Sequence, residues 1–243
     1  RALSSAASDV YKRQITNTGR MAQTVTPTAA IPLYGRSADN IRDHRHVTSL
    51  LHRIETTDTG VLVTPTLSFD ERGHQVNHMT YYCVGWSGNG EKPVDFYPTA
   101  EDFVGEGGNF ERPYAIVKNA EGVKAGTKIE GLEAVGGLHF SEITLEPEEE
   151  CSYLIFTGIT EDIQEIRNLS KTYTTREKVL EELEKTKAYW QEKVNVAYHT
   201  GDSDFNQFMH WVSFQPILRR IYGCSFLPHH DYGKGGRGWR DLW

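Results

Sequence analysis

The hydrophobic pattern of this chain changes abruptly near residue 170, and that change restricts the folds the chain can adopt. From residue 15 to residue 160, short β-branched and aromatic segments recur between turn residues, which is typical of an antiparallel sandwich. The segments expected to form strands are residues 61–69, 80–86, 114–117, 138–145 and 151–156. Helical periodicity follows them. The sequence therefore predicts a mixed fold class, in which an N-terminal antiparallel β-sandwich precedes helices.

Two turn signals divide the strand-rich region. Ser87-Gly88-Asn89-Gly90 combines residues that favour a tight turn. The acidic run Glu146–Glu150 is expected to join two strands as a hairpin connection. A solvated turn explains these charges better than a metal site does.

Two helices are expected after the strands. Thr174-Thr175-Arg176-Glu177 reads as a capping box, in which Thr174 and Glu177 satisfy each other's backbone donors. The apolar face of this helix is formed by Val179, Leu183, Thr186, Trp190 and Val194, and mixed Glu and Lys fill the opposite face. A second helix is expected to begin at residues 201–204, with Pro216 kinking or dividing it and Gly223 ending it.

Residues 1–14 are expected to lie outside the fold. Asp9-Val10-Tyr11-Lys12-Arg13-Gln14 resembles the translation of a transposon end that is used to prepare sequencing libraries, and an Ala/Ser-rich run precedes it. A short basic organellar presequence is the alternative. A secretory signal is disfavoured because the segment has no apolar core.

Composition excludes several classes of function. The net charge of −7 argues against nucleic acid or an anionic membrane as a partner, and no run of eighteen apolar residues is present. Cys83, Cys151 and Cys224 are odd in number and far apart, which favours reduced thiols in a cytoplasmic protein. We expect no metal site, because the spacing of His44, His46 and His52 matches no known ligand pattern and favours surface or core histidines.

The last fifteen residues, 229–243, carry the densest functional signal. They combine two arginines, a lysine, two histidines, two aspartates, a tyrosine and two tryptophans with repeated glycine. Glycine allows close approach of the backbone to a ligand, aromatic rings stack on sugar faces, and Arg and Asp make charge-assisted hydrogen bonds. This pattern predicts a ligand-binding loop of a larger enzyme.

Three stretches resemble glycoside hydrolase family 94, the inverting phosphorylases of cellobiose, cellodextrin, laminaribiose and chitobiose. Phe96–Gly105 resembles a sandwich segment of that family, in which Phe-hydrophobic-Gly follows a short acidic turn. Leu145–Glu150 followed by Leu154–Gly158 resembles the final sandwich strands. Gly238-Trp239-Arg240-Asp241 is the most specific stretch and is similar to the family's Gly-aromatic-Arg-Asp loop.

The resemblance implies a domain order that agrees with the pattern of predicted elements. We expect a β-sandwich domain over residues 15–160 and a helical linker over residues 161–200. Residues 201–243 are expected to begin a truncated (α/α)6 catalytic barrel. The resemblance also implies a homodimer in which the sandwich contributes to the interface and to the rim of the partner's active site.

The resemblance places sugar-binding residues in the terminal loop. Asp241 falls on the aspartate that accepts hydrogen bonds from the hydroxyls of the non-reducing sugar, and Arg240 supports it or touches the sugar. Arg237, and after it Lys234, are candidates for a further sugar-binding arginine, and Trp239 is a candidate stacking platform. The alternatives are a structural Arg240–Asp241 ion pair and core positions for the two tryptophans, the better interpretation for Trp243. His229 and His230 could help to neutralise phosphate, although no motif supports that role.

The implied reaction is phosphorolysis. A β-linked oligosaccharide and inorganic phosphate give α-D-glucose 1-phosphate and a shortened sugar, with phosphate as the co-substrate and no cofactor. By resemblance the general acid is an aspartate beyond Trp243. We therefore assign no catalytic residue within these 243 residues and expect the fragment to be inactive.

Two other functions remain open. A hydrolase of similar design, such as a glucoamylase-like enzyme, would need a second carboxylate that activates water. A non-catalytic carbohydrate-binding sandwich would need an exposed row of aromatic side chains. The candidates for such a row are Tyr81, Tyr82, Trp86, Phe96 and Tyr97, although core positions are more common for residues of this kind.

Overall fold

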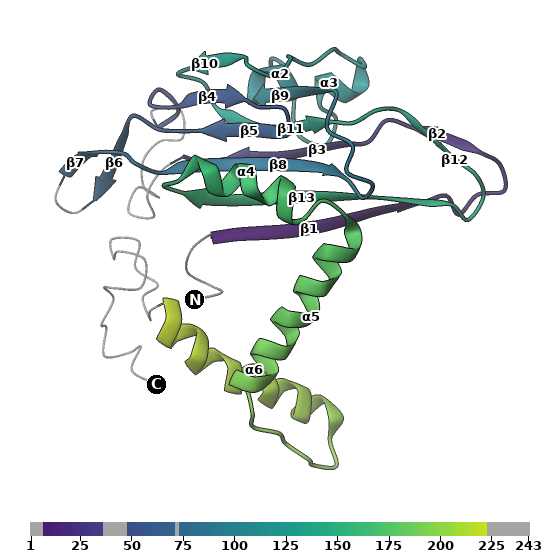
Figure 1. Cartoon of the computed structure of the whole chain (residues 1–243), viewed down its shortest axis with the longest axis vertical. Coiled ribbons are helices and arrows are strands. Elements are labelled where there is room, and N and C mark those ends of the chain that lie inside the picture. The colour runs from purple at the N-terminus through teal and green to yellow at the C-terminus, as the bar shows by residue number, and fades with distance from the viewer. Residues whose placement is uncertain (1–6, 36–47, 71–72, 223–243) are drawn as a thin grey trace. The chain divides into compact units, whose positions relative to one another are not determined.

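The computed structural model describes residues 7–35, 48–70 and 73–222 (Figure 1). It divides the chain into two compact units. One contains most of the strands, through Lys178, and the other contains mainly residues from Val179 onward. Each unit is described separately below.

The first unit is built on a six-stranded antiparallel sheet with the strand order β1-β13-β8-β5-β4-β10. Its strands are β1 (Ala7–Thr16), β4 (Arg53–Thr56), β5 (Gly60–Val63), β8 (Thr80–Ser87), β10 (Lys128–Glu130) and β13 (Glu150–Thr160). A three-stranded sheet packs on it, in the order β3 (Thr28–Leu33), β11 (Ala134–His139) and β9 (Asp95–Thr99). Contacts of β11 with β5 and β8 join the two sheets, which confirms the predicted antiparallel sandwich.

The main core lies between the two sheets. Its buried members are Leu33, Ile54, Val61, Val63, Cys83, Phe96, Ala134, Leu138, Phe140, Tyr153 and Ile155. Two pairs of short strands lie outside the two main sheets, β2 (Gln23–Val25) with β12 (Ile143–Leu145) and β6 (Leu67–Asp70) with β7 (Gly73–Val76).

Helices cover the outer face of each sheet (Figure 1). α2 (Ala100–Val104) and α3 (Tyr114–Val117) form a second small core with β9 and β11 around Tyr97 and Val135. On the six-stranded sheet, α4 (Ile163–Thr172) packs against β8 and β13. Beside it, Trp86 stacks on Phe156 at 4.8 Å and donates from Nε1 to the Tyr173 carbonyl at 2.8 Å.

This layering explains why β8 reads as a continuous hydrophobic run. Seven of its eight residues are buried, because one face packs on the three-stranded sheet and the other on α4. A strand covered on both faces loses the alternation of polar and apolar residues.

The acidic run Glu146–Glu150 does not form the predicted hairpin. β12 pairs with β2, whereas β13 pairs with β1, so the run is a bend inside one long two-stranded ribbon. Asn17 holds this bend. Its side-chain amide donates to the carbonyls of Leu145 (2.8 Å) and Met21 (2.9 Å), and its side-chain oxygen accepts from the Gly19 N–H.

Three predicted strands also differ. Residues 61–69 are split at Pro65 into β5 and β6, and residues 138–145 are split into β11 and β12. Residues 114–117 form the helix α3, whose N-cap is Pro113 and whose one buried residue is Ala115. The β-branched residues in this segment suggested a strand. Strand propensity depends on tertiary context, and here the segment packs as one helical turn with a single buried side chain.

Residues 7–14 belong to the fold, contrary to the prediction that residues 1–14 lie outside it. They form most of β1, which pairs with β13 from Ala7↔Ile159 to Thr16↔Glu150. β1 is an edge strand, and edge pairing uses backbone groups that almost any sequence supplies. The transposon origin of these residues stays a prediction.

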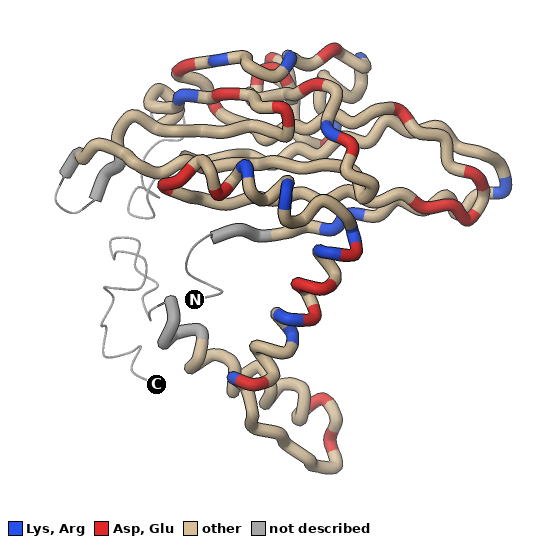
Figure 2. Tube along the Cα trace, in the orientation of Figure 1, with Lys and Arg blue, Asp and Glu red and all other residues tan. Residues whose placement is uncertain are grey.

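The helices α5 (Arg176–Lys193) and α6 (Ser203–Tyr222) lie where helical periodicity predicts them, and α6 continues through Pro216 as one helix. Glu177 interacts with the Thr175 hydroxyl rather than with Thr174, and hydrogen bonds from its own backbone and from Thr175 lower its pKa. Lys and Glu alternate along α5 (Figure 2), as in the ion pair Lys187–Glu184 at 2.6 Å. In the second unit, Trp190 of α5 packs edge-on against Phe214 of α6 at 4.7 Å.

Candidate functional site

The predicted sugar-binding residues lie outside the described part of the chain. This holds for Lys234, Arg237, Trp239, Arg240 and Asp241. It holds also for His229, His230, Trp243, and the histidines His44 and His46. Their roles stay predictions.

The most chemically capable group in the described residues is a pair formed by Asp95 and His139. The two residues lie directly opposite each other on β9 and β11, and His139 Nδ1 is 2.6 Å from Asp95 Oδ1. Both side chains are largely buried. The carboxylate therefore fixes the orientation of the imidazole, as an acid–base residue would require.

The surroundings of this pair indicate a structural use. Lys124 donates to the Val94 carbonyl at 3.1 Å and lies 3.9 Å from Asp95 Oδ2. A side chain at Gly122 would come within 2.5 Å of Asp95 Oδ1, so glycine makes room for the carboxylate. Asp95, at the start of β9, thus contacts both His139 and the segment 122–124. Sequence reasoning missed it because cross-strand register brings the two residues together across more than forty positions.

A surface hollow of about 350 Å³ lies beside this segment, lined by Tyr97, Tyr114, Gly122 and several carboxylates. The Tyr97 hydroxyl donates to the Ala120 carbonyl at 2.6 Å. Burial, together with the negative charge of Asp95, raises the pKa of Tyr97 to about 12. Tyr97 is therefore a neutral hydrogen-bond donor at physiological pH and not a base.

The aromatic residues that a carbohydrate-binding sandwich would display are not on the surface. Tyr82, Trp86, Phe96 and Tyr97 are each at most 2% exposed, and Tyr81 packs against the core. The core interpretation of these five residues is confirmed. These five residues therefore do not form the exposed aromatic row that this alternative function requires.

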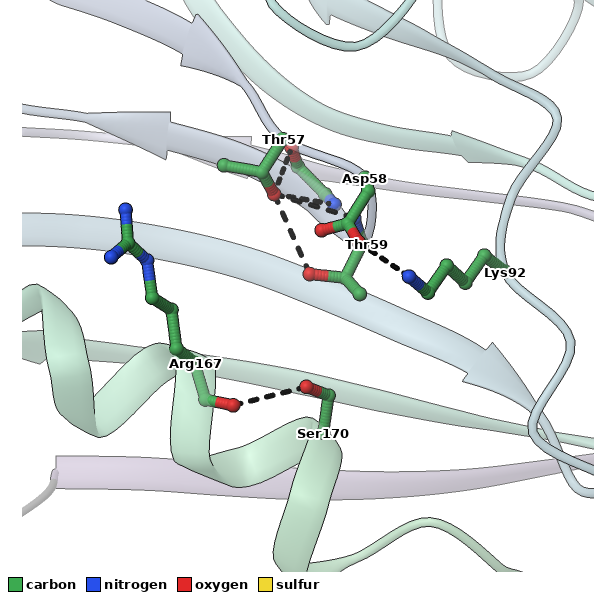
Figure 3. Close-up of polar contacts among 7 residues, drawn as sticks. Thr57, Asp58, Thr59, Lys92, Arg167 and Ser170 are labelled. Carbon is green, nitrogen blue, oxygen red and sulfur yellow. Dashed lines mark hydrogen bonds and ion pairs between the residues drawn. The ribbon is translucent and has the colours of Figure 1, made fainter.

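Figure 3 shows polar contacts around the turn between β4 and β5. The Thr57 hydroxyl accepts from the N–H groups of Thr59 and Gly60 in the β4–β5 turn, at 3.3 and 3.2 Å. Asp58 pairs with Lys92, and both side chains are more than half exposed. Exposed pairs of this kind contribute little to stability.

The helical unit contains an apolar hollow of about 560 Å³, lined by Trp190, Trp211, Phe214 and His210 among others. The side chains of Phe208 and Trp211, both on α6, are more than half exposed.

No metal site and no membrane span are found in the parts of the chain that the structure describes. Within residues 7–35, 48–70 and 73–222, no group of three His, Cys, Asp or Glu side chains is placed to hold a metal ion. None of the described helices has the length and apolar character needed to cross a membrane.

The comparison with protein families gives one match. The model of the glycosyl hydrolase 94 supersandwich domain matches residues 6–176, which is more than two thirds of the 243 residues and includes both sheets and α4. A search of curated proteins gave no match. The extent of the domain match, together with the two-sheet architecture that it covers, shows that this chain belongs to the glycosyl hydrolase 94 family.

Proposed function

We propose that this chain forms the supersandwich and following helices of an inverting β-glucoside phosphorylase. The enzyme would convert a β-linked oligosaccharide and phosphate into α-D-glucose 1-phosphate and a shortened sugar. The match of residues 6–176 to the supersandwich domain carries the proposal. The order of elements supports it, because the sandwich is followed by α5 and α6 and then by the Gly-Trp-Arg-Asp motif.

The chemistry requires one carboxylic acid and a bound phosphate. An inverting hydrolase needs a second carboxylate to activate water, whereas phosphate is itself a competent nucleophile. The acid protonates the leaving oxygen, and cationic and N–H groups hold phosphate below the anomeric carbon. Attack from that face inverts the β-glycoside into an α-phosphate.

The proposal assigns binding of the non-reducing sugar to the terminal loop. Asp241 accepts hydrogen bonds from the sugar hydroxyls, Arg240 supports it, and Trp239 offers a stacking surface. Arg237 or Lys234 supplies a further cationic contact. The general acid is assigned to a position beyond Trp243, so the 243 residues by themselves are expected to be inactive. A cytoplasmic homodimer that uses phosphate and no other cofactor belongs to the same proposal.

The test uses the complete protein, supplied with α-D-glucose 1-phosphate and, separately, glucose, cellobiose, laminaribiose and sophorose. Phosphate release that depends on one acceptor supports the proposal and identifies the linkage. Asp241→Asn should lower that rate at least tenfold, while Asp204→Asn, at an exposed position in the first turn of α6, should leave it unchanged. Release of glucose from oligosaccharides without phosphate, and no phosphate release with any acceptor, would instead identify a hydrolase.

A further inference from the structure

His52 is a buried titratable residue that the proposed chemistry does not use. It follows the turn Thr48–Leu51, directly precedes β4, and is 3% exposed. The turn is closed by hydrogen bonds from the N–H groups of Leu51 and His52 to the carbonyls of Thr48 and Ser49. His52 therefore ends a turn that is held against the sandwich.

The hydrogen bonding of the ring assigns its tautomer. Nδ1 lies 3.1 Å from the Leu132 carbonyl, just before β11, and a carbonyl only accepts. Nδ1 therefore carries the proton and Nε2 carries a lone pair. Nε2 is fully buried, and no group among the described residues donates a hydrogen bond to its lone pair.

The environment of Nε2 is confined. It faces Gly35, two residues after β3, where an added Cβ would lie 3.2 Å from Nε2. His52 also lines a cavity of about 10 Å³, together with Leu33, Thr48, Ser49 and Glu133. A cavity of this size has room for about one water molecule, so bulk solvent does not reach the ring.

Among the described residues, two backbone carbonyls and one carboxylate influence the charge of the ring. Glu133 precedes β11 and favours the charged form, as do the backbone carbonyls of Leu132 and Gly35. The Arg53 guanidinium donates to the His52 carbonyl at 2.9 Å and lies 3.4 Å from the Glu130 carboxylate. Tyr34, which follows β3, and Thr48 and Ser49 of the turn line the same cavity. Burial is the largest effect, and the pKa of His52 is lowered.

We propose that His52 is a proton-controlled latch. In its neutral form it holds the turn Thr48–Leu51 and the residues just after β3 against the residues just before β11. Protonation places a charge in a confined site beside Gly35 and releases the turn. Because the folded-state pKa lies below the unfolded value, the stabilisation is complete above about pH 6.5 and is lost as the pH falls below that value.

The test is hydrogen exchange of the complete protein, measured for the peptide that contains residues 48–56 at pH 7.5 and pH 5.5. After correction for intrinsic exchange, protection in the wild type should fall at pH 5.5 by up to about tenfold, the limit for one group titrating one unit below pH 6.5. His52→Asn keeps a donor toward Leu132 but does not titrate, so its protection should not change between the two pH values. His78→Asn removes an exposed histidine and should behave as the wild type.

Equal loss of protection in wild type and His52→Asn would overturn the proposal, as would equal protection of the wild-type peptide at both pH values. If His52→Asn does not fold, the titration of the wild-type imidazole by NMR decides instead. A pKa below 6.5 that coincides with loss of protection at residues 48–56 supports the latch, and a pKa at or above 6.5 contradicts it.

Discussion

At the scale of single residues, Gly136 sets the distance between the two sheets. A Cβ at this position would come within 2.2 Å of Cys83 Cβ across the core. Because Cys83 is fully buried, the facing strand has no free space into which it can move.

Gly136→Ala should therefore destabilise the sandwich by about 1–3 kcal/mol through overpacking. The change is measured as the urea midpoint of the complete protein, with protection of β8 and β11 in hydrogen exchange as the local readout. Gly201→Ala is the matched control, since no atom lies within 4 Å of its added Cβ, and it should change stability by less than about 0.5 kcal/mol. Equal effects of the two substitutions would show that Gly136 is not a packing constraint.

The same burial makes Cys83 chemically inert. Desolvation raises the pKa of its thiol to about 12, so almost no thiolate forms at pH 8. Iodoacetamide at pH 8 should leave Cys83 unmodified in the native complete protein and modify it once the protein is unfolded in urea. Cys151, which is partly exposed, should react faster in the native state. Rapid native modification of Cys83, read by peptide mass mapping, would contradict its place in the core.

Residue-level reasoning from the sequence recovered the core but little of the polar architecture. The burial of Tyr82, Trp86 and Phe96 follows from their apolar character, and the structure confirms it. The Asp95–His139 pair depends on strand register, which local spacing does not encode. The sugar-binding prediction at Asp241 rests on a local motif, and nothing in the described residues tests it.

At the scale of elements, the long ribbon of β1–β2 and β12–β13 is held at its bend by Asn17. Its buried amide makes three hydrogen bonds, to the Leu145 and Met21 carbonyls and from the Gly19 N–H. A side chain that satisfies three backbone groups is hard to replace, because each unpaired buried group carries a desolvation penalty.

Asn17→Ala should cost about 2 kcal/mol of stability and increase hydrogen exchange in residues 17–25 and 143–150. Asn89→Ala serves as the control, because Asn89 is exposed in the β8–β9 connection, and it should have little effect. Unchanged exchange in the ribbon would mean that the backbone ladder alone holds the bend.

Helices with clear periodicity were predictable as elements, whereas short strands and their partners were not. α5 and α6 lie where the recurrence of apolar residues places them. Residues 114–117 have strand-like composition but form α3, since a four-residue segment carries too little pattern to outweigh its tertiary contacts. The acidic run 146–150 was a correct turn signal, but its partner strands depend on β1 and β2, far away in the sequence.

At the scale of the whole molecule, the family follows from the supersandwich, and the proposed reaction follows from the family. The matched domain contains the two sheets and the helices that cover them, whereas α6 and almost all of α5 lie beyond it. The central claim is therefore the use of phosphate in place of water and the inversion that results.

The most direct measurement follows the anomeric product by NMR when the complete protein acts on the β-linked glucoside that the acceptor panel identifies. We predict that α-D-glucose 1-phosphate appears as the first glucosyl product and that its formation stops when phosphate is omitted. Formation of free glucose at the same rate with and without phosphate would contradict the account, and β-D-glucose 1-phosphate as the first product would contradict inversion.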